Sequence, residues 1–230
     1  ELLSLGFNHS FSEERWLWLH HENLLAPSSI ILVRHEDKLV GIYSVIRKYI
    51  NYKGNRIVGG RDIDPVVHPD YRGKGIFSML LNEGKQRFSE IEIFYNFANE
   101  KSSPGFIKNG WSKIVYRKLV VINLPVIRDF YRLIILLISL NIRTKNLSIS
   151  EFALISDFKF ENEELIYDGE IYVEKSKSYY KWRYDQNPDK KYRFFICTNN
   201  AKQIGVIICS ETHNKLSING IACIKGYCKF

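Results

Sequence analysis

The sequence of 230 residues lacks any apolar run long enough to cross a bilayer as a helix. Such a helix needs about 20 consecutive apolar residues, and the longest candidate, Leu133 to Ile142, is roughly half as long. We therefore expect no membrane span. The run is better explained as part of a buried helix.

Cysteine is scarce, with four residues at Cys197, Cys209, Cys223 and Cys228. No two of them have the C-x-x-C spacing of a zinc site or a thioredoxin-like redox centre. They lie mostly in apolar runs, where a free cysteine behaves as a small hydrophobic residue. We expect reduced thiols in a cytoplasmic protein and no metal.

The excess of charge of one sign is modest. There are 33 Lys and Arg against 25 Asp and Glu, a net charge of +8, which suits an anionic ligand. Nucleic-acid binders concentrate basic residues in a stripe with interleaved aromatics, whereas the densest basic run, Lys181 to Arg193, includes Asp185 and Asp189. We expect a solvated basic face here, not a nucleic-acid surface.

What the sequence does contain is an internal repeat at a constant separation of 164 residues. The identical pairs are Ser12 and Ser176, Trp18 and Trp182, Asn23 and Asn187, Lys38 and Lys202, and Gly41 and Gly205. A strand–turn–strand pattern follows in each copy, at 30–45 and at 194–209. We predict a complete first unit over 1–122, a linker helix within 123–146 and an incomplete second unit over 147–230.

The first unit alternates helical and extended patterns, which predicts an α/β fold. The expected helices are Phe11 to Asn23, capped by Ser12, then Gly75 to Phe88 and a helix after Asn99. The expected strands are Ile30 to Val33, Leu39 to Ile50, Arg56 to His68, Ile91 to Phe97 and Ile114 to Ile122. Apolar residues at helical spacing also predict a helix over Pro125 to Lys145.

The segment from Val66 to Phe77 carries the strongest chemical signal. A buried strand runs into the turn Arg72-Gly73-Lys74-Gly75, which opens a helix at Ile76. Glycines allow backbone amides to approach a ligand, and the helix start adds partial positive charge. Together they predict a pyrophosphate cradle.

The same segment resembles the acyl-CoA signature of the GCN5-related N-acetyltransferase (GNAT) family, which reads Arg or Gln, two residues, Gly, one residue, then Gly or Ala. Arg72 and Gly75 fit it, and Phe77 departs from it at the last place. The resemblance covers about residues 30–122 and implies a mixed, mainly antiparallel sheet flanked by helices, with a partial second copy. The implied co-substrate is acetyl-CoA.

Further positions follow from the resemblance. Asn99, which could equally cap a helix, holds the place of an Asn that contacts the pantetheine arm. Phe106 stands where the family often has a Tyr that protonates the departing thiolate, so no residue is assigned to that role. The backbone of Val66 and Val67 would bind the arm beside a bulge in the central strand, and Pro65 fits such a bulge.

An amine must lose a proton before it attacks the thioester, so a base or a water relay is needed. Asp62 and Asp64 are two residues apart on a strand, which predicts one shared face and makes them the best base candidates. A structural role in loop bonding is the alternative for both. His68 is expected either to face solvent or to bond within the turn. Trp16, Trp18, His20 and His21 either line an acceptor pocket or belong to the core.

The predicted function is transfer of an acetyl group from acetyl-CoA to a small-molecule amine, such as an amino sugar or amino acid derivative. Two alternatives stay open: a non-catalytic acyl-CoA-binding module, and a transferase that uses charged tRNA, as in cell-wall branching enzymes with two such units. The unfinished second sheet is expected to expose an edge near Leu216 to Cys223. A second copy of the chain covering that edge would form a homodimer.

Overall fold

The computed structural model describes residues 1–8, 10–23, 25–114, 147–155, 158, 171–212 and 215–223. The chain divides into two compact units, Glu1–Lys118 with Glu170–Glu174, and Leu119–Gly169 with Lys175–Phe230. The helix predicted over 125–145 and all but the first residue of the strand predicted over 114–122 lie outside the described residues.

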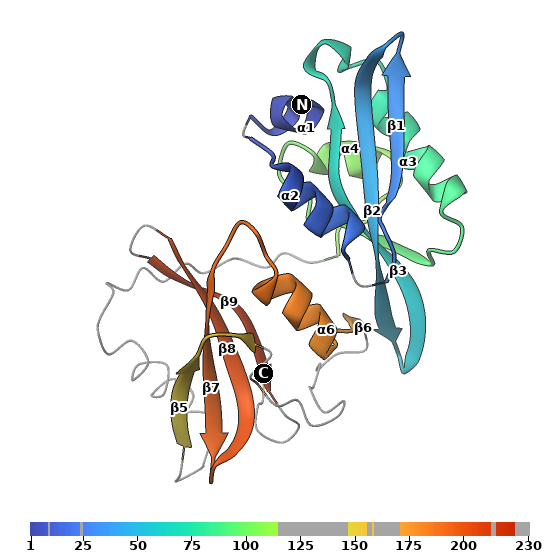
Figure 1. The fold of residues 1–230 in the computed structure, drawn as a ribbon. Coiled ribbons are helices and arrows are strands. Elements are labelled where there is room, and N and C mark those ends of the chain that lie inside the picture. Colours follow the sequence, from blue (N-terminus) through green and yellow to red (C-terminus); the bar gives the residue numbers. More distant parts are fainter. Residues whose placement is uncertain are drawn as a thin grey trace. The chain divides into compact units, whose positions relative to one another are not determined.

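The first unit contains a five-stranded sheet in the order β1-β2-β3-β4, with β6 paired to β2 (Figure 1). The strands are β1 Ser29–His35, β2 Lys38–Tyr52, β3 Asn55–Val67, β4 Ile93–Tyr95 and β6 Ile171–Val173. All neighbours are antiparallel except β3 and β4, which run parallel. The predicted mixed, mainly antiparallel α/β fold is confirmed, although β4 is shorter than the strand predicted over 91–97.

Short helices accompany this sheet. They are α1 Leu2–Phe7, α2 Glu13–Trp16 with a π-helical turn over Leu17–His21, a 3-10 turn over Pro69–Tyr71, α3 Ile76–Arg87 and α4 Ser103–Lys108. Ser12 caps α2, because its side chain accepts a hydrogen bond from the backbone N–H of Arg15. Helix α1 was not predicted, because its six residues are too few to establish a helical period.

The two faces of the first sheet are buried by different helices, and alternation along β2 separates them. Tyr43 and Val45 cluster with Leu80 and Leu81 of α3. Ile42, by contrast, clusters with Leu2 and Leu3 of α1 and with Val66 of β3. One face of the sheet therefore belongs to α3 and the other to α1.

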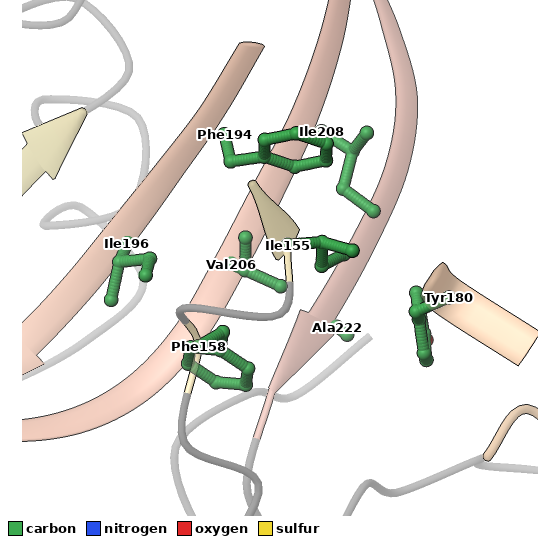
Figure 2. Close-up of a cluster of buried hydrophobic side chains, with 8 residues drawn as sticks. All are labelled: Ile155, Phe158, Tyr180, Phe194, Ile196, Val206, Ile208 and Ala222. Atoms are coloured by element: carbon green, nitrogen blue, oxygen red, sulfur yellow. The ribbon is translucent and has the colours of Figure 1, made fainter. Parts of the chain in front are cut away.

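The second unit contains a four-stranded antiparallel sheet in the order β5-β7-β8-β9. Its elements are β5 Leu147–Phe152, α6 Lys177–Tyr180 with a π-helical turn over Lys181–Asp185, β7 Tyr192–Asn199, β8 Lys202–Thr212 and β9 Lys215–Cys223. Figure 2 shows its core, which joins Tyr180 of α6 to side chains of the sheet such as Phe194 and Ile208.

The internal repeat extends to details of the backbone. Ser176 caps α6 by accepting from Tyr179 N, the counterpart of the Ser12 cap on α2. Both helices continue into a π-helical turn and then a β-hairpin whose register shifts at equivalent places, after Val33 and after Cys197. Trp18 and Trp182 are both buried. Residues at a separation of 164 thus have equivalent structural positions.

One strand crosses between the two halves of the sequence. β6 pairs with the end of β2 at Ile50, Asn51 and Tyr52 and so completes the first sheet. An ion pair between Arg56 Nε and Glu174 Oε2, at 2.9 Å, lies beside it. A strand of three residues carries too little pattern to be predicted from sequence.

The predicted exposed edge of the second unit is β9. Among the described residues it pairs only with β8. Ile218 and Ile221 on this strand are about half exposed. An open, apolar strand edge of this kind is a site for pairing with another chain.

Candidate active site

The turn between β3 and α3 contains two glycines in left-handed backbone conformations. The φ angle is 75° at Gly73 and 79° at Gly75. A Cβ atom added at either position would meet no atom within 4 Å. Glycine is required here by backbone conformation and not by crowding, and the open space beside it is accessible to a ligand.

The start of α3 presents backbone amides without helical partners. The first hydrogen bond of the helix runs from Met79 N to Gly75 O at 3.0 Å, and no side chain caps the helix. The N–H groups of Ile76, Phe77 and Ser78 therefore have no acceptor within the helix. Their partial positive charge favours an anion at this position.

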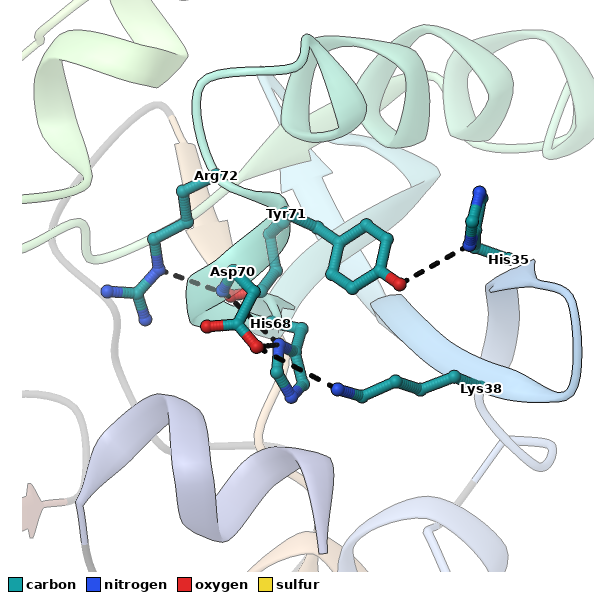
Figure 3. A network of polar contacts seen from close by, with 7 residues as sticks. His35, Lys38, His68, Asp70, Tyr71 and Arg72 are labelled. Carbon is teal, nitrogen blue, oxygen red and sulfur yellow. Dashed lines mark hydrogen bonds and ion pairs between the residues drawn. The ribbon is translucent and has the colours of Figure 1, made fainter.

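Figure 3 shows two cationic side chains near the same turn, Arg72 and Lys38, and Lys38 is paired with Asp70 at 3.9 Å. Arg72 is oriented by a hydrogen bond from its Nε to Val67 O at 3.2 Å. The Lys74 and Lys38 ammonium groups lie 4.7 Å and 5.7 Å from the centroid of the Tyr71 ring. Both ammonium groups thus lie against the Tyr71 ring of this turn, where a positive charge favours an anionic group.

His68 has a structural role in this turn, as expected from its position. It precedes the 3-10 turn, and its Nδ1 accepts a hydrogen bond from Asp70 N at 3.3 Å. Because Nδ1 is the acceptor, the proton of the neutral ring lies on Nε2.

A β-bulge interrupts β3 just before the turn. Tyr43 of β2 faces two residues of β3, Asp64 and Pro65, because the register shifts between the Ser44–Ile63 pair and the pairs that follow it. Asp64 has a left-handed φ of 50°. Proline fits here because it cannot donate a ladder hydrogen bond. The bulge proposed from Pro65 is present.

The bulge changes the expectation for the two carboxylates. Asp62 and Asp64 were predicted to share a face because side chains alternate along a regular strand. The strand is not regular at Asp64, where the left-handed backbone breaks the alternation. Sequence spacing alone therefore does not place them on one face.

β3 and β4 separate shortly before the bulge. The last β3–β4 pair is Arg61 with Tyr95, whereas β3 continues to Val67. We refer to the point after this last pair as the fork. His68 N donates to Val40 O of β2. Since backbone groups alternate in direction, the N–H and C=O of Val67 point away from β2, to the open side.

Asp62 follows the last pair at the fork and is buried, with 6% of its surface exposed. Its Oδ1 accepts a hydrogen bond from Tyr43 OH at 2.8 Å. Burial raises the pKa of Asp62 to about 7, against the opposing effects of Tyr43, Asn96 and the Lys85 charge. Its Oδ2 and Asn96 Nδ2 are buried, and each lacks a hydrogen bond within the described part of the chain.

Tyr43 is fixed by the helix above it. A Cβ atom at Gly84 of α3 would lie 2.3 Å from Cε1 of Tyr43, so glycine at 84 allows the helix to pack directly on this ring. Burial, followed by the neighbouring Asp62 charge, raises the pKa of the Tyr43 hydroxyl. Tyr43 therefore stays protonated and donates to Asp62.

Asn99 bonds within its own loop. Its Oδ1 accepts from Ser102 N at 2.9 Å and from Ser102 Oγ at 3.1 Å, just before α4. This contact uses the side-chain oxygen as a local cap. The pantetheine contact suggested by resemblance stays a proposal for the amide Nδ2.

Phe77 and Phe106 form one aromatic contact between α3 and α4. Their ring centroids lie 5.2 Å apart at an interplanar angle of 83°, and Trp111 packs on Phe106 at 5.1 Å. A Cβ at Gly105 would lie 2.9 Å from Cε1 of Phe77. The large residue at the signature's last place thus fits because residue 105 is glycine.

The aromatic and histidine residues before β1 belong largely to the core. Trp18 is buried, and Trp16 packs against the α1 cluster. The His20 ring lies against Trp16, with centroids 3.9 Å apart and an interplanar angle of 36°. Burial, helped by the Arg15 charge, lowers the pKa of His20 to about 4, so the ring is neutral.

Sequence reasoning missed Tyr43, Asn96 and the pair Arg61 and Phe97. Each acts through a contact that is distant in sequence, such as the bond from Tyr43 to Asp62 or the Arg61 guanidinium over the Phe97 ring. Only the register of β2, β3 and β4 brings these residues together. No local spacing in the sequence indicates it.

Within the described ranges, no group of three His, Cys, Asp or Glu side chains is placed to hold a metal ion. Cys197 and Cys209 are free and buried, and burial raises the pKa of both thiols to about 11. Nor is any helix of the described part long and apolar enough to span a membrane.

Comparison with protein families gives one match, to an acetyltransferase (GNAT) domain, over residues 1–113. The curated proteins give no match. Solved structures resemble the chain in fold at low sequence identity.

A probable N-acyltransferase from Enterococcus faecalis V583, a conserved protein of unknown function, has a TM-score of 0.62, 15% identity and 98% coverage of this chain. A GCN5-related N-acetyltransferase from Anabaena variabilis has a TM-score of 0.61, 16% identity and 97% coverage. This chain spans 55% of the length of each. A further one from Kribbella flavida has a TM-score of 0.51 at 13% identity.

Proposed function

Residues 1–113 form a GNAT acetyltransferase domain, and we propose that the protein moves an acetyl group from acetyl-CoA to a primary amine of a small molecule. The first unit carries the site. Amino sugars and amino acid derivatives are the acceptors we expect.

The juxtaposition of the amide-lined turn and the fork is the observation that supports this function most directly. The turn offers Ile76, Phe77 and Ser78 N–H groups to a pyrophosphate. Val67 lies on the short stretch of β3 between the fork and the turn, with its N–H on the open side. A ligand with phosphates at one end and a thioester at the other, joined by a polar arm, matches this layout.

In this proposal Arg72, Gly73, Lys74, Gly75, Ile76 and Phe77 bind the pyrophosphate, and Val66, Val67, Asn99 and Phe106 contact the arm. Val67 is the better backbone donor, because its N–H points away from β2. The backbone groups of the preceding residue, Val66, point the opposite way, toward β2. A backbone N–H aimed at the thioester carbonyl would stabilise the charge that develops on its oxygen.

Asp62 is the candidate for proton transfer. An ordinary carboxylate is too weak a base for an ammonium group, but a group with a pKa of about 7 can both accept and return a proton near neutral pH. Asp62 faces α3, so it would take the proton that the attacking amine loses through a water in the fork, and return it to the departing thiolate. Phe106 has no proton to give. Asp64, half-buried in the bulge, stays a second candidate.

Amine-dependent thiol release tests this function. The protein is mixed with acetyl-CoA and single amines from a panel of amino sugars and amino acids, and free CoA is measured with a thiol reagent. We expect release to rise with one class of amine and the acetylated product to appear in equal amount. Acetyl-CoA binding without turnover would instead identify a binding module, and turnover only with charged tRNA would identify an aminoacyl transferase.

A further inference from the structure

The face of the first sheet opposite α3 carries a polar aromatic cluster at the fork. Asp62 faces α3, since it bonds to Tyr43 of the α3 cluster. Its neighbour Arg61 therefore faces the other side, the α1 face. Arg61 pairs with Tyr95, and the Phe97 ring is in contact with both side chains.

The geometry of the three residues is that of an open platform. The Arg61 guanidinium lies 5.2 Å from the Phe97 ring centroid, and the Tyr95 and Phe97 rings meet edge to face with centroids 6.3 Å apart. The Phe97 residue is 80% exposed, although it follows directly on a half-buried strand. A large aromatic ring held in solvent by two neighbours offers a flat surface for stacking.

The cluster of Arg61, Tyr95 and Phe97 lies where an acceptor could approach the proposed reaction. Arg61 and Tyr95 are the last pair before β3 and β4 separate, so the cluster borders the fork. The turn that would hold the nucleotide leads into α3, on the opposite face. An acceptor that approaches the thioester from the α1 face would pass over Arg61 and Phe97.

The second unit provides an internal comparison. Arg61 pairs with Ile46, and the equivalent pair in the second unit is Ser217 with Ser210. The cation is therefore specific to the unit that has the glycine turn. A residue needed only to hold the sheet together would not require a charge at this place.

We propose that Arg61, Tyr95 and Phe97 form the acceptor platform, and that it selects an amine carrying both a ring and an acidic group. This rests on the proposed function. The Phe97 ring stacks on the apolar face of the acceptor ring, and the Arg61 guanidinium pairs with a phosphate or carboxylate on the same molecule. Tyr95 orients Phe97 through their edge-to-face contact.

The probes are glucosamine 6-phosphate, which has a ring and an acidic group, glucosamine, which has only the ring, and 3-aminopropyl phosphate, which has only the acidic group. Binding to the full chain is measured by calorimetry in the presence of CoA. Phe97→Ala and Arg61→Gln are compared with matched controls Tyr52→Ala and Arg34→Gln, which lie away from the fork.

We expect glucosamine 6-phosphate to bind at least about tenfold more tightly than either partial probe. Phe97→Ala should weaken both sugars about tenfold. Arg61→Gln should reduce the affinity for the phosphate compounds only, so that the sugar and its phosphate bind alike. Both controls should match the wild type.

Equal binding of glucosamine and glucosamine 6-phosphate by the wild type would overturn the proposal. So would failure of all three probes to bind, or an unchanged phosphate preference in Arg61→Gln. Each variant is also titrated with CoA alone. Failure of the wild type to bind CoA would contradict the proposed function itself. Normal CoA binding, with no change in probe binding in Phe97→Ala and Arg61→Gln, would contradict only the platform.

Discussion

At the scale of single residues, we propose that the site depends on one buried carboxyl group. Asp62 of β3 is shielded from water, with Tyr43 as its hydrogen-bond donor. A pKa of about 7 means that the folded state keeps the proton of Asp62 at pH values where the unfolded chain, with the ordinary value of 3.8, has lost it. A group held this way costs stability once it ionises.

This has a measurable dependence on pH. The folded pKa is raised, so the free energy of unfolding falls as pH rises from about 4 to about 7. Asp62→Asn keeps a neutral group next to Tyr43 and removes this titration. We expect the free energy of unfolding of the variant, relative to the wild type, to increase by about 2 to 3 kcal/mol from pH 5 to pH 8. Amine acetylation should be lost.

Urea denaturation at the two pH values, with matched Asp37→Asn as a control on the exposed β1–β2 turn, provides the measurement. A difference between Asp62→Asn and wild type that stays constant from pH 5 to pH 8 would show that Asp62 has an ordinary pKa. Full turnover in the same variant would remove it from the proton path.

At the scale of elements, the local pattern of the sequence predicted most of the first unit. β1, β2, β3 and α3 follow from β-branched runs and from an apolar helical stripe, and the turn follows from Gly73 and Gly75. The missing parts depend on pairing across the sheet. The three residues of β6 and the Tyr43–Asp62 bond are set by register, which a single sequence does not encode locally.

The residues of the candidate site also fall into two groups, those that follow from local sequence and those that depend on pairing across the sheet. Arg72 to Phe77 could be proposed from the sequence, because the role proposed for them depends on consecutive backbone amides. Arg61, Asn96 and Phe97 could not, because their neighbours come from other strands. The shared face of Asp62 and Asp64 stays a prediction, since the bulge between them depends on the partner strand as well as on Pro65.

The contact between α3 and α4 leads to a prediction about the thiolate. Phe106, with 4% of its surface exposed, packs between Phe77 and Trp111. Phe106→Tyr should keep or raise turnover, because the added hydroxyl supplies a proton donor and buried Trp111 Nε1 lacks a hydrogen bond within the described residues. Phe106→Ala should mainly destabilise the fold, by about 3 to 5 kcal/mol.

Steady-state turnover and thermal melting of both variants test this. A folded Phe106→Tyr protein with turnover reduced more than roughly 100-fold would show that the site requires an apolar ring at this position. In that case the proton of the thiolate would not depend on a group at position 106.

At the scale of the whole molecule, two units of the chain share a structural pattern but differ at the glycine turn. Both copies keep the capped helix, the π-helical turn, the buried tryptophan and the hairpin. The glycine turn occurs in the first copy, after β3, while the described part of the second copy ends with β9. We propose that the second unit binds no nucleotide.

Calorimetric titration of the chain with acetyl-CoA tests whether the glycine turn of the first unit binds the nucleotide. Gly75→Glu places a negative charge at the turn, and Gly54→Glu is the matched control, because Gly54 also has a positive φ and open space around it, but lies in the β2–β3 hairpin turn. We expect about one acetyl-CoA site per chain in the wild type and in Gly54→Glu, and none in folded Gly75→Glu. Two sites per chain, or unchanged binding by Gly75→Glu, would contradict it.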